Sequence, residues 1–264
     1  MKHHFVYIFS YNWVKNFFML KSNEIKFIKS LYLKKNRDEN SLFIVEGEKI
    51  VSELIDSDFI IDKVYATEAY YDLYSSKIKE EMLFKITQKE LSRISNLKSP
   101  NNVLAIVKKK NIELDYDKIQ GLTLVLDNIN DPGNFGTIIR SCNWFNIKSI
   151  ICSDNTVDLY NSKVIQSSMG SLFRVDIFYT NLVDFFEKCS DNFHVYGAVL
   201  EGKDSKTVNV KPNSLLIIGN ESHGISDALT QFIDTKITIK KFSDQIDSLN
   251  AATATSILLY EFSK

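Results

Sequence analysis

The sequence has few of the residues from which metal centres and disulfide frameworks are built. Its 264 residues include only three cysteines and four histidines. Cys142, Cys152 and Cys189 are scattered without paired spacing, and the histidines form no cluster that could bind a metal. Scattered cysteines in odd number favour a reducing compartment, so we expect a cytoplasmic protein with neither a disulfide framework nor a metal site.

A long apolar run is also missing. The run from Phe5 to Phe9 is interrupted soon afterwards by Asn12 and Lys15, and no small-residue cleavage site follows it. A stretch this short cannot cross a bilayer, so we expect no membrane association. Because Met19 directly precedes a helical pattern, we expect residues 1–18 to be an extension outside the fold.

Neither sign of charge dominates, since the formal net charge is -1. The distribution is less even than the total. Residues 15–37 and residues 85–110 each hold seven lysines and arginines against a single glutamate. Such clusters suit either a phosphate-facing surface or an ordinary solvated face, and charge alone does not separate the two.

The first part of the chain alternates between strand and helix patterns. Strands are predicted at 41–45, near 64, at 83–86 and at 103–107, and helices at 22–31, 46–55, 70–79 and 89–94. This alternation predicts a small α/β domain over residues 19–108. The polar residues 109–120 are typical of a linker.

A second alternating series fills residues 121–264. Strands are predicted at 122–126, 149–152, 174–179, 195–199, 215–218 and 236–239, and helices at 133–145 and 249–262. Fully apolar strands such as 215–218 favour a mostly parallel sheet that is covered on both faces. In such sheets, ligands bind at the carboxyl ends of the strands.

The usual phosphate-binding and nucleophile motifs are absent. No G-x-G-x-x-G follows a strand, and the sequence contains neither a P-loop nor a G-x-S-x-G elbow. Three polar segments stand instead where strands end. They are Asn128–Arg140, Gly219–Ser226 and Ser248–Glu261.

The first segment begins a helix. Asp131 can cap it and Pro132 suits its first turn. Arg140 should lie about 9 Å along the helix axis from Asn134. The alternative interpretation is a capped helix with a solvent-facing arginine. Capping explains Asp131 and Pro132, but it does not also explain Asn134 and Arg140.

The other two segments are open to two interpretations each. Glu221 is either an exposed loop acid or a carboxylate of a site. Ser248 is a natural cap for the last helix. Whether Ser248 and Asn250 also act on a substrate is not decided by the pattern.

Taken in order, the three segments resemble the three motifs of the SpoU/TrmH family, which are RNA ribose 2′-O-methyltransferases of the SPOUT class. The likeness covers residues 121–264. Residues 23–108 resemble that family's L30e-like substrate-binding domain, mainly through Phe43–Lys49. The resemblance implies methyl transfer from S-adenosylmethionine to RNA, a C-terminal trefoil knot, and a homodimer with its active site near the interface.

The resemblance also implies the site residues by motif position. Asn134 and Arg140 come from the first motif, Glu221 from the second, and Ser248 and Asn250 from the third. Backbone groups would hold the methyl donor at Gly219, Ile239 and Leu249.

These residue types suit the implied reaction. The donor is already activated, so positioning supplies much of the rate, whereas the 2′-hydroxyl must lose its proton as it attacks. Arg140 either takes that proton or clamps the neighbouring phosphate. Because arginine normally stays protonated, the identity of the general base is left open, and His223 is another candidate. Glu221, Ser248 and Asn250 are suited to orienting Arg140 and the ribose.

A ribose 2′-hydroxyl restricts the substrate to RNA. The extra N-terminal domain favours ribosomal RNA over transfer RNA. Two alternatives stay open: a non-catalytic RNA-binding or ribosome-assembly protein with the same fold, and a different α/β nucleotide-binding enzyme, which the missing glycine loop disfavours.

One segment departs from the family pattern. Before the third motif the family commonly reads I-P-x-x-G, followed by three residues and S-L-N. Here lysines follow Ile239 and Ser243 replaces the glycine, in a loop one residue longer. Without the proline and glycine, we expect a loop that is more mobile before the donor binds.

Overall fold

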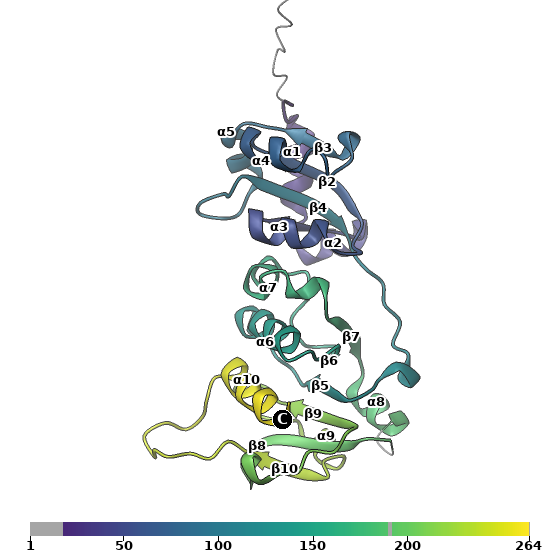
Figure 1. The fold of residues 1–264 in the computed structure, drawn as a ribbon, viewed down its shortest axis with the longest axis vertical. Helices are drawn as coiled ribbons and strands as arrows, with labels where there is room; N and C mark the ends of the chain where they lie inside the picture. Colours follow the sequence, from purple (N-terminus) through teal and green to yellow (C-terminus); the bar gives the residue numbers. More distant parts are fainter. Residues whose placement is uncertain (1–17, 190–191, 264) are drawn as a thin grey trace, which may run out of the picture.

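A computed structural model describes residues 18–189 and 192–263, which fold around two sheets (Figure 1). The N-terminal sheet has four strands and the C-terminal sheet has six. The α/β class predicted from the sequence is confirmed. None of the helices in these residues is long and apolar enough to span a membrane.

The four-stranded sheet has the order β1-β4-β2-β3, with β4 antiparallel to β1 and β2, and β3 parallel to β2. The strands are β1 (Leu42–Glu46), β2 (Ile61–Ala66), β3 (Leu83–Lys85) and β4 (Val103–Lys108). The helices are α1 (Ser22–Ser30), α2 (Lys34–Asn40), α3 (Glu48–Ile55), α4 (Glu68–Tyr74) and α5 (Gln88–Ile94). Since successive side chains of a strand point to opposite faces, one face of the sheet packs on α1 and α5 and the other on α3 and α4.

Phe18 belongs to this domain, although the sequence placed it in an extension outside the fold. Its backbone N–H donates to the Lys85 carbonyl at 2.6 Å, and its ring lies 4.7 Å from that of Phe84. The expected boundary at Met19 is therefore at least one residue too late. The rest of the expected extension, residues 1–17, lies outside the described residues.

All pairings in the six-stranded sheet are parallel, as the apolar strands predicted. Its order is β10-β8-β9-β5-β6-β7. The strands are β5 (Leu122–Leu126), β6 (Ser149–Ser153), β7 (Asp176–Thr180), β8 (His194–Asp204), β9 (Ser214–Ile218) and β10 (Thr235–Thr238). The central strands β9, β5 and β6 are buried almost throughout, because helices cover both of their faces.

Helices α6 (Pro132–Trp144), α7 (Ser162–Ser168) and α10 (Ala251–Phe262) pack on one face, and α8 (Leu182–Cys189) and α9 (Asp227–Thr230) on the other. Neither α7 nor α8 was predicted. α7 is short and polar, and it is held by packing against α6 at Gly136, where a Cβ would overlap Ser167 and the Val164 carbonyl. The intrinsic helix propensity of its residues therefore contributes little to the stability of α7.

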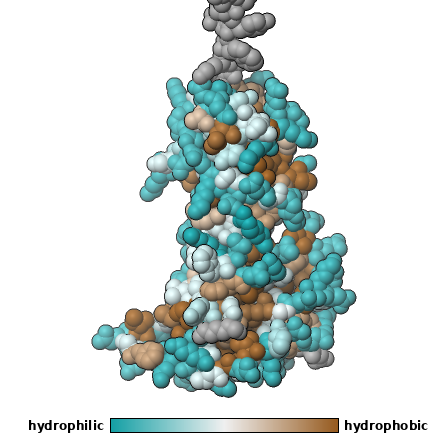
Figure 2. Space-filling model, viewed as in Figure 1, coloured by the Kyte–Doolittle hydropathy of each residue, from teal (hydrophilic) through white to brown (hydrophobic). Residues whose placement is uncertain are grey.

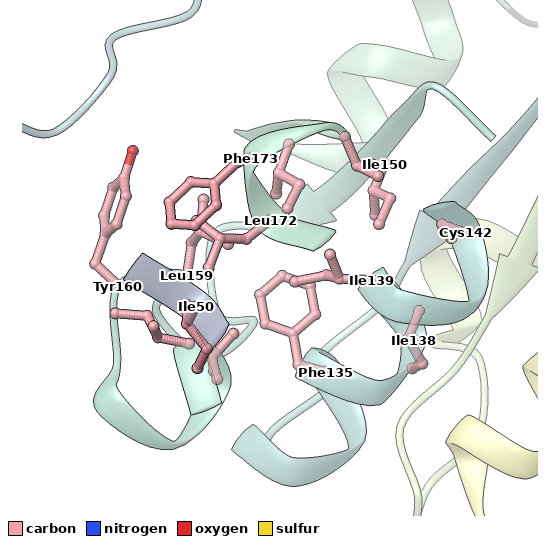
Figure 3. Packing of buried hydrophobic residues seen from close by; sticks show 14 of the residues in the cluster. Ile50, Phe135, Ile138, Ile139, Cys142, Ile150, Leu159, Tyr160, Leu172 and Phe173 are labelled. Atoms are coloured by element: carbon pink, nitrogen blue, oxygen red, sulfur yellow. The ribbon is translucent and has the colours of Figure 1, made fainter. Parts of the chain in front are cut away.

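The two domains share one hydrophobic core. The Phe43 ring of β1 lies 4.4 Å from that of Tyr160. Figure 3 shows Ile50 from α3 among Leu159, Phe173 and Phe135 of the C-terminal domain. The N-terminal domain is therefore seated directly on the α6 and α7 side of the larger sheet.

Candidate functional site

The site begins where β5 ends and α6 starts. Asp131 accepts a hydrogen bond from the Asn134 backbone N–H at 2.8 Å, and Pro132 occupies the first turn, so the predicted cap is confirmed. This N–H lowers the pKa of the Asp131 carboxyl, and Lys163 at 3.4 Å lowers it further. The cap therefore fixes the first turn of α6, from which the side chain of Asn134 projects.

The side-chain amide of Asn134 joins all three polar segments. Its Nδ2 donates to Glu221 Oε1 at 2.9 Å, and its Oδ1 accepts from Asn250 Nδ2 at 2.8 Å. Asn250 also caps α10, because its Oδ1 accepts from the N–H groups of Ala252 and Thr253. The structure thus brings together one predicted residue from each segment.

Ser248 is not the cap of α10, in contrast to the expectation. The helix begins three residues later, and Asn250 takes that position. Ser248 is exposed, and no hydrogen bond of its side chain is found in the described residues. It lies at the end of an exposed segment, 240–250, that projects from the body of the molecule between β10 and α10 (Figure 1).

Arg140 lies apart from the other predicted residues. It is exposed, six residues beyond Asn134 on α6, and its guanidinium makes no hydrogen bond or ion pair to any described residue. In the described residues, no hydrogen bond joins Arg140 to Glu221, Ser248 or Asn250, so the expectation that these residues orient Arg140 stays a prediction.

Two of the predicted donor-binding backbone positions directly follow strands that lie on either side of β8. Gly219 directly follows β9, and Ile239 directly follows β10. A Cβ at Gly219 would overlap the backbone of Gly224, so only glycine fits where this turn folds back on itself. Leu249, the third position, is half exposed just before α10.

Sequence reasoning missed three residues beneath the site. Asp127 is buried directly after β5, Asn128 adopts a left-handed conformation with φ 56°, and Asn220 closes the turn that carries Glu221. An acid placed directly after a buried strand was the available signal for Asp127. The other two depend on contacts between distant segments.

α6 and α10 run side by side in the same direction from this site. Ser141 and Ser256 are hydrogen bonded at 2.8 Å, and the rings of Phe145 and Tyr260 lie 6.4 Å apart. At the far end of the pair, Trp144 is 83% exposed and Tyr260 59%. Two large aromatic side chains are therefore left in solvent.

The site offers amides and a carboxylate rather than a metal-ligand set. Within the part of the chain that the structure describes, no group of three or more His, Cys, Asp or Glu side chains could hold a metal ion. Uncharged amides held by one another are suited to orienting hydroxyl groups by hydrogen bonds.

Two families match this chain. The SpoU rRNA Methylase family matches residues 121–260, and the MRM3-like substrate binding domain matches residues 22–105. A curated relative from Bacillus subtilis, 23S rRNA (guanosine(2553)-2'-O)-methyltransferase RlmP, is 26% identical over 247 residues. The match covers 91% of this chain and 96% of the relative.

Two solved structures are similar to this chain over most of its length. A TrmH-family protein from Porphyromonas gingivalis is 32% identical with a TM-score of 0.83, covering 92% of this chain and 98% of its own. An AdoMet-bound rRNA methyltransferase from Sinorhizobium meliloti is 28% identical with a TM-score of 0.83, over 92% and 95% of the two chains.

Proposed function

The chain belongs to the SpoU rRNA methylase family, and from that premise we propose that it transfers a methyl group from S-adenosylmethionine to a ribose 2′-hydroxyl in structured RNA. Ribosomal RNA is the preferred substrate over transfer RNA, as the name of the Bacillus subtilis relative supports. The observation that carries the proposal is the Asn134 amide, which bridges Glu221 and Asn250 at 2.9 and 2.8 Å.

The proposed roles follow from this geometry. Asn134, Glu221 and Asn250 form a hydrogen-bonded row that orients the ribose. Arg140 clamps the adjacent phosphate or takes the hydroxyl proton, and Ser248 contacts the ribose once the exposed segment closes. Backbone groups at three positions hold the donor: Gly219, Ile239 and Leu249. S-adenosylmethionine supplies the activated methyl group.

The N-terminal domain is proposed to bind the RNA. Many lysines of the two basic stretches are already paired with acids, as Lys34 is with Asp38 at 2.6 Å and Lys110 with Asp58 at 2.7 Å. By contrast, no ion pair in the described residues involves three exposed lysines on α1 and α5: Lys26, Lys29 and Lys89. The basic surface is therefore narrower than the charge count suggested, and it lies on the sheet face opposite the methyltransferase domain.

We propose that the functional unit is a homodimer formed through the exposed side of α6 and α10. Trp144 and Tyr260 stand exposed there, and large apolar surface is typical of such interfaces. Arg140 lies on the same helix, and its guanidinium has no hydrogen-bond or ion-pair partner among the described residues, so a second copy would give it one. Trp144→Asp should convert the dimer to a monomer, as measured by analytical sedimentation. An unchanged dimer would mean that the interface lies on another surface.

Two further expectations remain proposals. The C-terminal trefoil knot is implied by the family, and a cytoplasmic location is supported by three buried, unpaired cysteines. Burial raises the pKa of the Cys189 thiol to about 11, which suits a structural role.

The deciding experiment incubates the purified protein with radiolabelled S-adenosylmethionine and ribosomal or transfer RNA from a strain lacking the protein. We expect label in ribosomal RNA, at one 2′-O-methyl site that is absent from the deletion strain. RNA binding without any transfer would favour the non-catalytic alternative.

A further inference from the structure

A buried acid, Asp127, lies beneath the site and has no part in the proposed reaction. It directly follows β5 and is 3% exposed. Its Oδ2 accepts from the Ser226 backbone N–H at 2.7 Å, and its Oδ1 accepts from Asn128 Nδ2 at 2.8 Å. No ion pair in the described residues involves this side chain. A buried carboxylate without a cation is costly unless N–H groups bond it, so these two donors determine its place.

Asn128 extends the connection to the start of the Glu221 turn. Its carbonyl accepts from Asn220 Nδ2 at 2.7 Å. Asn220 in turn closes the turn, because its Oδ1 accepts from the N–H groups of Ser222 and His223 at 2.9 and 3.1 Å. Glu221 is therefore held from both sides, by Asn220 before it and by Ser226 after it.

The backbone of Asp127 bonds to the sheet, whereas its carboxylate bonds to the loops. The β5–β9 ladder runs through backbone groups and ends with the Asp127 N–H donating to the Ile218 carbonyl at 2.9 Å. Among the described residues, the carboxylate itself bonds only to Asn128 and Ser226, which lie in the loops after β5 and β9. Losing the carboxylate should therefore leave the sheet in place while releasing the turn that carries Glu221.

We propose that Asp127 is a positioning residue for methyl transfer. It holds the Glu221 turn where Glu221 can accept from the Asn134 amide at 2.9 Å. Asp127 touches no substrate in this scheme, and its effect on the rate passes through Glu221. The inference rests on the proposed function, because it assigns to that reaction a residue outside the three motif sets.

Asp127→Asn is the informative variant. It keeps the shape of the side chain, but an amide nitrogen cannot accept a hydrogen bond, so either Ser226 or Asn128 loses its acceptor. Losing one such bond should lower kcat about tenfold or more. RNA affinity should stay unchanged, because the basic surface lies in the other domain.

A second variant removes the donor instead of the acceptor. Ser226 has φ -62°, close to the angle that proline fixes, so Ser226→Pro deletes the N–H that donates to Asp127 and puts a ring carbon in its place. It should lower kcat in the same way. The matched control is Ser214→Ala, a buried residue at the opposite end of β9 whose hydroxyl donates to the Lys211 carbonyl at 2.6 Å. The control should lose stability without losing kcat.

The test is a double-mutant cycle with Glu221→Ala, which removes the acceptor of the Asn134 amide, read as kcat at saturating RNA and donor. If Asp127 acts through Glu221, then Asp127→Asn lowers kcat by no more than about twofold in the Glu221→Ala background. Losses that simply multiply, or a single variant with wild-type kcat, would overturn the proposal.

Hydrogen exchange keeps this inference separate from the proposed function. Amide exchange across residues 219–226 should speed up in Asp127→Asn and Ser226→Pro, but not in Ser214→Ala. If the wild-type chain transfers no methyl group, the proposed function fails while exchange still tests whether Asp127 holds the turn. Unchanged exchange in both variants would overturn the positioning role by itself.

Discussion

At the scale of single residues, the site depends on the side-chain amide of Asn134, whose nitrogen and oxygen bond to different residues. Asn134 donates to a carboxylate and accepts from a second amide, so its orientation is determined by its partners. Aspartate at this position could not donate to Glu221, and alanine could do neither. A side chain held this firmly loses little freedom when a ribose binds, which favours catalysis by positioning.

Arg140→Ala should abolish methyl transfer while leaving the fold intact. The guanidinium makes no hydrogen bond or ion pair to the described residues, so the free energy of unfolding should change by about 0.5 kcal/mol or less. Turnover should fall about 100-fold or more, because a phosphate clamp or a base is lost. Single-turnover rates and melting curves measure both effects.

The control for this variant is Lys148→Ala, an exposed cation at the amino end of β6. It should match the wild type in both measurements. Near-normal turnover by a well-folded Arg140→Ala protein would remove Arg140 from the catalytic set.

Residues with a local signal could be predicted from the sequence, and those without one could not. Asp131 was recognisable as a cap because it stands just before Pro132 at the end of a strand. Ser248 carried the same kind of signal, but Asn250 is the cap, because α10 starts later than the apolar pattern suggested. Asn220 acts on Asn128, 92 positions away, and nothing in the sequence around either residue indicates that contact.

At the scale of elements, the segment between β10 and α10 differs most from the rest of the domain. Residues 240–250 are all exposed, with Phe242 at 84% and Ile246 at 63%. Figure 2 shows the apolar residues of this projecting segment out in solvent. This exposure supports the mobile-loop expectation, which stays a prediction.

We predict weak binding of S-adenosylmethionine that tightens when RNA is present. Ordering an exposed loop costs free energy, which RNA offsets if Lys240 or Lys241 reaches a phosphate. Calorimetry with and without substrate RNA measures the difference. Lys240→Pro combined with Ser243→Gly restores the proline and the glycine of the family pattern, but not its loop length, and should tighten donor binding without RNA. Equal, tight binding by the wild-type chain in both cases would contradict the mobile loop.

The α1 and α5 surface yields a separate prediction about RNA affinity. The double variant Lys29→Ala and Lys89→Ala should weaken binding and flatten its dependence on salt, by about 0.7 to 0.9 in the log–log slope for each phosphate that is no longer neutralised. Lys34→Ala is the matched control, since Asp38 already neutralises that lysine. Filter binding over a salt series decides the matter. Identical slopes in all three proteins would mean that these lysines only solvate the surface.

At the scale of the whole molecule, the expected linker does not separate two independent bodies. The sequence could predict each domain from its own pattern, but not the core that they share. That core depends on α7, which has little helical signal, and on aromatic contacts such as Phe59 with Phe173, at 5.2 Å. Arg174 also pairs with Glu53 across the junction. The N-terminal domain is thereby held in a set orientation to the site.

A largely buried ion pair, Arg37–Asp158, also crosses this junction at 2.6 Å, with side chains that are only 5% and 15% exposed. Asp158→Ala leaves the arginine buried without its partner, so it should cost about 3 kcal/mol of unfolding free energy. Lys35→Ala, which breaks an exposed pair with Glu39 at 3.8 Å, should cost less than about 0.5 kcal/mol. Urea unfolding followed by near- and far-ultraviolet circular dichroism measures both. We expect coincident transitions for the wild type and separated ones for Asp158→Ala, since the weakened junction uncouples the domains. Equal stability of the two variants would show that apolar packing alone joins the domains.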